Sequence, residues 1–132
     1  MANREFLFRG KEEPFGNWVE GFLIDESHIG DWTQSRSVDP ETVGQYVGRT
    51  DVNGKRIFEG DIVKAAVTEN RWDSIKKYTG EYVVAYHPKY CYFYLKRNRN
   101  NLLFDGNWSY VLDSIEVIGN IHDNPELLEG QT

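Results

Sequence analysis

Apolar side chains recur mainly at every second position along the chain, which is the period of a strand with one buried face. Residues 18–25 alternate in this way, and a turn containing Pro14 and Gly16 separates them from the short apolar run 6–8. These two runs are predicted to pair as a hairpin. Residues 26–42 are polar, and they predict a loop with at most one short strand.

Two tight turns divide the next part of the chain. Asn53-Gly54 suits the two-residue type I′ turn of a hairpin, because both residues tolerate positive φ. Glu59-Gly60-Asp61 is predicted to form a second turn, in which the Asp61 carboxylate accepts backbone N–H groups. The strands predicted around these turns are residues 43–49, 56–58 and 62–68, with Val63, Ala65 and Val67 facing the core.

The alternation breaks over residues 69–79, where the spacing of the apolar residues fits a short helix and an ordered loop equally well. It then resumes, and residues 81–87 and 90–97 are predicted to form a hairpin. Cys91 is predicted to point inward on the second arm as a small core residue. Later strands are predicted over 102–104, 108–112 and 116–121, with a one-turn cap over 125–128.

Short strands with turns every 8–12 residues predict a mainly β protein. We expect short antiparallel strands that form a small SH3-like barrel with an N-terminal β-hairpin lobe. The 132 residues fit a single domain, residues 1–132. If the domain has two lobes, they are predicted to be residues 1–42 and 43–132.

Charge is distributed unevenly along the chain. The net charge is −6, but residues 51–100 carry ten Lys/Arg against six Asp/Glu, whereas residues 101–132 carry six Asp/Glu and no Lys/Arg. The overall acidity argues against general binding to nucleic-acid phosphates, and the basic middle leaves a local patch open. A single cysteine, Cys91, and the lack of a long apolar run predict a cytoplasmic protein with no membrane segment.

Three parts of the chain resemble the YopX family of small proteins encoded by phages and prophages. The central part, VGQYVGRTDVNGKRIFEGDIV, is the most specific. The resemblance implies a phage or prophage origin, a location in the host cell cytoplasm and an all-β fold, and it supplies no activity, cofactor or catalytic residue. The resembling segments are residues 4–10 with 18–24, residues 43–63 and residues 115–128.

The residues predict no catalytic or metal site. The three histidines, His28, His87 and His122, lie far apart without metal-ligand spacing. The segment from Asp51 to Gly54 weakly resembles a calcium-binding loop. Its glycine is the fourth residue, whereas a calcium loop has glycine at the sixth, so a turn is favoured. Gly-x-Ser-x-Gly and phosphate-loop motifs are absent from the sequence. We therefore expect a protein that is not an enzyme and needs no cofactor.

The middle of the chain carries the candidate interaction surface. Tyr90, Tyr92 and Tyr94 are predicted to share one face of a strand, and Tyr82 and Tyr86 a face of its partner. Basic residues follow at the end of the second strand. The candidate residues are Tyr82, Tyr86, Tyr90, Tyr92, Tyr94, Lys96, Arg97 and Arg99.

Two functions follow from this surface. The first is a non-enzymatic interaction module that binds a host or phage protein, and itself, through the tyrosine-rich sheet and the acidic ends. It is favoured because exposed aromatic patches more often meet protein. The alternative is a single-stranded nucleic-acid-binding protein in phage replication or regulation, since tyrosines beside basic side chains can stack bases. The net charge disfavours this alternative.

Overall fold

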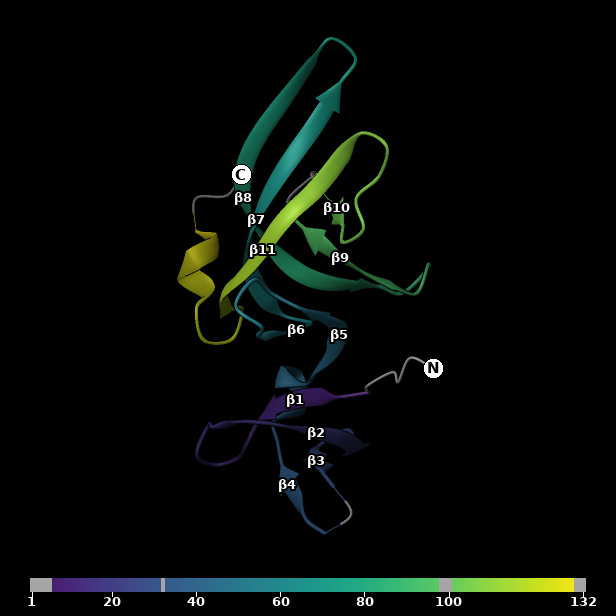
Figure 1. Cartoon of the computed structure of the whole chain (residues 1–132). Helices are drawn as coiled ribbons and strands as arrows, with labels where there is room; N and C mark the ends of the chain where they lie inside the picture. The colour runs from purple at the N-terminus through teal and green to yellow at the C-terminus, as the bar shows by residue number, and fades with distance from the viewer. Residues whose placement is uncertain (1–5, 32, 98–100, 130–132) are drawn as a thin grey trace. The chain divides into compact units, whose positions relative to one another are not determined.

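The computed structural model describes residues 6–31, 33–97 and 101–129 (Figure 1). The chain divides into two compact units, Met1–Arg49 and Thr50–Thr132. Antiparallel strands make up most of both units, which confirms the prediction of a mainly β protein. In the described parts of the chain, no helix has the length and apolar character to cross a membrane.

The first unit is a sheet in the order β4-β3-β2-β1-β5. The predicted N-terminal hairpin is confirmed, because β1 and β2 pair antiparallel with Phe8 opposite Gly21. A single 3₁₀ turn, η1, precedes the last strand. The elements are β1 (Phe8–Lys11), β2 (Trp18–Asp25), β3 (His28–Gly30), β4 (Ser35–Ser37), η1 (Pro40–Thr42) and β5 (Gly44–Thr50).

Residues 26–42 contain two strands, β3 and β4, so the prediction of a loop with at most one strand is wrong. The reason is that the described residues of this segment bury only two large apolar side chains, Ile29 and Val38, each about 1% exposed. Both pack over Gly10, where an added Cβ would lie 3.0 Å from the Val38 Cβ. β3 buries one side chain, that of Ile29, and the three residues of β4 are all exposed, so neither strand produces a readable period of two.

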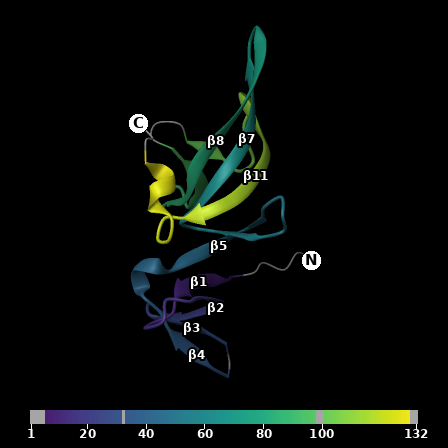
Figure 2. The same cartoon turned by 90° about the vertical axis from the view of Figure 1, so that its left-hand side faces the viewer.

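The second unit is a sheet in the order β10-β9-β8-β7-β11, and Figure 2 shows its three longest strands side by side. Val63, Ala65 and Val67 are fully buried on β7, as predicted. Tyr82, Val84, Leu95 and Ile115 complete the centre of this core. The elements are β6 (Arg56–Phe58), β7 (Asp61–Arg71), β8 (Ser74–His87), β9 (Tyr92–Lys96), β10 (Leu102–Leu103), β11 (Tyr110–Asn120) and η2 (Pro125–Leu128).

Strands β7 and β8 form one continuous hairpin through residues 69–79, so neither the short helix nor the ordered loop predicted there is present. Their backbone pairing runs out to Arg71 and Ser74, and only two residues make the turn. The projecting part is solvated on both faces, with Trp72 99% and Ile75 69% exposed. A strand pair without a buried face shows no alternation in its sequence.

The Asn53-Gly54 turn is not of type I′, because only Gly54 has a positive φ, of +80°. The Gly54 N–H donates to the Asp51 carbonyl over 3.0 Å, and the Asp51 N–H donates to the Lys55 carbonyl over 2.8 Å. This is the pattern of a three-residue loop closed by a left-handed glycine. The second predicted turn is confirmed, with Gly60 at φ +92° and the Phe58 N–H donating to the Asp61 carboxylate over 2.7 Å.

The strand ladder of the second unit is open in its described residues, with β10 and β11 as its two edges. A side chain brings these edges together, because the Tyr110 hydroxyl donates to the Leu103 carbonyl over 3.1 Å. No pairing of β10 with β11 closes the sheet within the described part of the chain. The SH3-like barrel is therefore not confirmed and stays a prediction.

Candidate interaction surface

The register between β8 and β9 sorts the candidate tyrosines onto two faces. Tyr86 lies directly opposite Phe93. Because side chains opposite one another share a face and successive ones alternate, Tyr82 and Tyr86 lie on the face of Phe93. Tyr92 and Tyr94 lie on the other face. The five predicted tyrosines are therefore not one surface.

Tyr82 belongs to the core and not to an interaction surface. It is 1% exposed, and burial raises the pKa of its phenol above the ordinary value, so the hydroxyl stays protonated. Arg97 is half-buried on the same face, where a Cβ added to Gly80 would lie 2.9 Å from its guanidinium. Tyr86 is 40% exposed, and its ring packs edge-on against Phe93 with centroids 5.2 Å apart. Arg99 lies outside the described residues.

The three remaining tyrosines, Tyr90, Tyr92 and Tyr94, form a contiguous row that we call the tyrosine ladder. Neighbouring ring centroids are 6.3 Å and 6.1 Å apart. The His87 ring contacts all three, at 4.9 Å, 5.3 Å and 5.9 Å. Tyr90 is 62% and Tyr92 40% exposed. The ladder is thus an ordered aromatic surface that faces solvent.

The turn between β8 and β9 places the first ring of the ladder. Cys91 has a positive φ of 57°, and its N–H donates to the His87 carbonyl over 2.7 Å. The Tyr90 N–H is 3.3 Å from His87 Nδ1. Cys91 is exposed in this turn, so its predicted core position is wrong. Strand alternation begins only at Tyr92, because the turn uses the residues before it.

Lysines stand at both ends of the ladder. The Lys89 ammonium lies 5.3 Å from the Tyr90 ring centroid, a cation–π distance. Lys96 is exposed on the ladder face, two residues after Tyr94. No Asp or Glu occurs in the sequence from residue 82 to residue 97. This stretch of the chain is therefore basic, although the chain is acidic overall.

A Ser–His–Asp contact in the turn between β2 and β3 was missed in the sequence. His28 Nδ1 lies 2.8 Å from an Asp25 carboxylate oxygen and 3.2 Å from the Ser27 hydroxyl. Both partners contact the same ring nitrogen, whereas a catalytic relay needs one partner on each nitrogen. Within the described ranges, no three His, Cys, Asp or Glu side chains are placed to share a metal ion.

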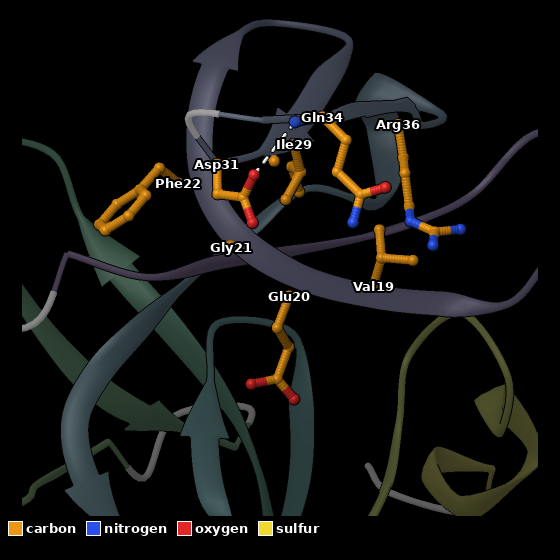
Figure 3. Close-up of a pocket in the computed structure, with 9 residues that line it drawn as sticks. Val19, Glu20, Gly21, Phe22, Ile29, Asp31, Gln34 and Arg36 are labelled. Carbon is orange, nitrogen blue, oxygen red and sulfur yellow. Dashed lines mark hydrogen bonds between the residues drawn. The ribbon is translucent and has the colours of Figure 1, made fainter.

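A hollow beside β2 in the first unit is a weak ligand site (Figure 3). Its volume is about 170 Å³, below the ~300 Å³ at which ligand pockets begin. The Asp31 carboxylate already accepts hydrogen bonds from the N–H groups of Thr33 and Gln34. The bond from Thr33 is the main cause that lowers the pKa of Asp31. The Arg36 guanidinium pairs with Glu12 at 3.1 Å. Two of the charged side chains at this hollow, Asp31 and Arg36, thus have partners within the chain.

Segments 51–63 and 115–122 meet through the backbone in the second unit. The Val52 N–H donates to the Ile115 carbonyl over 3.0 Å, and the Ile121 N–H donates to the Gly60 carbonyl over 2.9 Å. The Asp51 carboxylate also accepts the Val117 N–H over 2.9 Å. These contacts give two of the segments that resemble the YopX family a structural role.

The fold and this surface define an all-β protein of two compact units, with an exposed aromatic ladder on the second unit. The chain belongs to the YopX family, because the family model described as "YopX protein" matches residues 12–129. The resemblance seen in the sequence is thereby confirmed.

A solved structure has a similar fold, the crystal structure of protein EF1440 from Enterococcus faecalis. The two chains are 24% identical, with a TM-score of 0.56, and the similarity covers 96% of this chain and 100% of EF1440. A comparison with curated proteins found no match. The similarity supports the fold and assigns no activity.

Proposed function

We propose that the chain is a non-enzymatic protein-interaction module, encoded by a phage or prophage, that acts in the host cytoplasm. It binds a partner protein through the tyrosine ladder. The observation that carries the proposal is the row of three tyrosines packed against His87, of which Tyr90 and Tyr92 are exposed and Tyr94 is half-buried.

The ladder has the properties of a binding anchor. Tyrosine offers a large apolar face and one hydroxyl, and it loses little conformational entropy on binding. Contacts at 4.9–6.3 Å among the four rings hold these side chains in place before a partner arrives. Lys89 and Lys96 at the ends match the polar rim that surrounds such anchors. The energy of interfaces concentrates in residues of this kind.

Replacing the two most exposed rings tests the proposal. Tyr90→Ala with Tyr92→Ala is expected to weaken partner binding by at least about 30-fold, because truncated anchors of an interface typically cost this much. The measurement is capture of host proteins from nuclease-treated lysate by the tagged chain, followed by titration of the captured partner. Trp72→Ala is the matched control, since Trp72 is 99% exposed in the turn before β8, whereas the ladder follows the other end of that strand. Equal capture by the double tyrosine variant and by the control would contradict the proposal.

The spacing of the ladder favours one second candidate, binding of single-stranded nucleic acid. Ring centroids about 6 Å apart approach the spacing of bases along an extended strand, and flanking lysines can hold phosphates. In that case Lys89→Glu with Lys96→Glu abolishes binding of a labelled oligonucleotide, and added salt weakens binding of the unaltered chain steeply. Fluorescence anisotropy at low salt measures both effects. No binding by the unaltered chain at low salt would exclude this candidate.

A further inference from the structure

The first unit carries an exposed apolar segment that ends in acidic residues. Phe22 is 52%, Leu23 39% and Ile24 52% exposed at the end of β2. Asp25 and Glu26 follow directly and are also exposed. The pKa of Asp25 is lowered, mainly by a hydrogen bond from the Ser27 N–H, so the Asp25 carboxylate is charged at neutral pH. We call residues 22–26 the acidic tip.

The acidic tip and the tyrosine ladder have opposite charge environments. The exposed charged residues of the acidic tip are Asp25 and Glu26, whereas those beside the ladder are Lys89 and Lys96. Two ladders facing one another would bring lysines together, and two tips would bring carboxylates together. Like charges at an interface cost binding energy and complementary charges favour it. A tip facing a ladder is the one combination that matches both charge and apolar surface.

We propose that the tyrosine ladder of one copy of this chain binds the acidic tip of a second copy. Phe22 and Ile24, which are both exposed at the end of β2, pack on the tyrosine rings. Asp25 and Glu26 lie near the lysines at the ends of the ladder. This inference rests on the proposed function, because it names the partner at the same surface.

A contact between two different surfaces has a structural consequence. Each copy presents one ladder and one tip, so every contact leaves a free ladder at one end and a free tip at the other. Such a head-to-tail contact repeats until it closes a ring or extends as a chain. The smallest closed ring is a reciprocal dimer with two ladder–tip contacts, so the mass of the assembly rises with concentration from the monomer to this ring, a larger ring or a chain.

Two variants of the full chain, each missing one surface, test the proposal. The ladder variant is Tyr92→Ala with Lys96→Glu, and the tip variant is Ile24→Ser with Glu26→Lys. Both alter exposed side chains, and Asp25 is kept because it holds the turn through the Ser27 N–H over 2.9 Å. Thermal unfolding by circular dichroism checks that both variants fold. The control is Trp72→Ala with Lys76→Glu, which removes an exposed aromatic and an exposed base from the outer part of the β7–β8 hairpin.

The readout is molar mass by light scattering over roughly a hundredfold range of concentration. The unaltered chain and the control are expected to increase in mass with concentration, while each variant alone stays monomeric. An equimolar mixture of the two variants is expected to form a one-to-one complex, because the intact tip of one meets the intact ladder of the other. Failure of that mixture to associate would overturn the proposal.

The same set of proteins separates this inference from the proposed function. If the unaltered chain is monomeric at every concentration, but the ladder variant loses a protein captured from lysate, the ladder binds a different protein. The interaction module then stands and self-association is excluded. If the ladder variant changes neither mass nor capture, both proposals fail. If the ladder variant binds an oligonucleotide less well than the unaltered chain, while the tip variant and the control bind it equally well, the partner is a nucleic acid.

Discussion

Tyr82→Ala is expected to destabilise the second unit by about 4 kcal/mol, the loss typical of removing a fully buried aromatic side chain. Tyr82 is 1% exposed. The same core contains buried side chains from three other strands, Val67 of β7, Leu95 of β9 and Ile115 of β11. The backbone of β8 is paired on both sides, so it cannot collapse into the space that the ring leaves. Chemical denaturation followed by tyrosine and tryptophan fluorescence measures the loss.

Two comparisons show whether the core position is the cause. Tyr82→Phe keeps the ring and removes only the hydroxyl, so a loss of about 1 kcal/mol is expected. Tyr92→Ala removes a half-exposed ring of the ladder and is expected to cost much less than Tyr82→Ala. Equal losses for Tyr82→Ala and Tyr92→Ala would contradict the division of the tyrosines into a core face and a surface face.

Asp51→Ala is expected to cost about 3 kcal/mol of unfolding free energy. The Asp51 carboxylate is 7% exposed and accepts three backbone N–H groups, those of Asn53, Lys55 and Val117, each over 2.9 Å. Hydrogen bonds to a charged acceptor are each worth about 1.5–3 kcal/mol, and their losses are not additive. Removing the carboxylate leaves these donors without their acceptor and releases the 51–55 turn from β11.

The contribution of Asp51 depends on pH. Burial acts to raise the pKa of this carboxyl, but hydrogen bonds from the Val117, Lys55 and Asn53 N–H groups outweigh it, so the pKa lies below its ordinary value. The unfolded chain therefore binds the proton more tightly than the folded chain. The stabilisation is fully present above the unfolded pKa, about 4, and it is lost as pH falls through the folded value.

Denaturation midpoints measured from pH 7 down to about pH 2 check this dependence. Asp51→Asn removes the titrating group, so its midpoint is expected to fall less between pH 5 and pH 2 than that of the unaltered chain. Asp73→Asn is the control, because Asp73 is exposed in the β7–β8 turn. An acid dependence that is identical in all three proteins would show that Asp51 does not hold the turn as a carboxylate.

Strands with one buried face were predictable from the sequence. Val63, Ala65 and Val67 recur at every second position in the predicted strand 62–68, and they are the buried face of β7. The hairpin over 81–97 was also predicted, because a turn separates two strands that each bury one face. Val84 and Leu95 lie opposite one another on the buried face. Segments that bury little gave no such pattern, and β3, β4 and the outer part of the β7–β8 hairpin were missed for that reason.

The amino-acid pattern alone indicated the mainly β fold, its family and the region that holds the candidate interaction surface. It did so because alternation and turn residues are local properties of the chain. Only the three-dimensional structure decided which tyrosines are buried. Tyr82 and Tyr92 look alike in the sequence, but the register of β8 against β9 puts one in the core and the other in solvent. Register arises from contacts between distant residues, and a shift of one position would reverse every face.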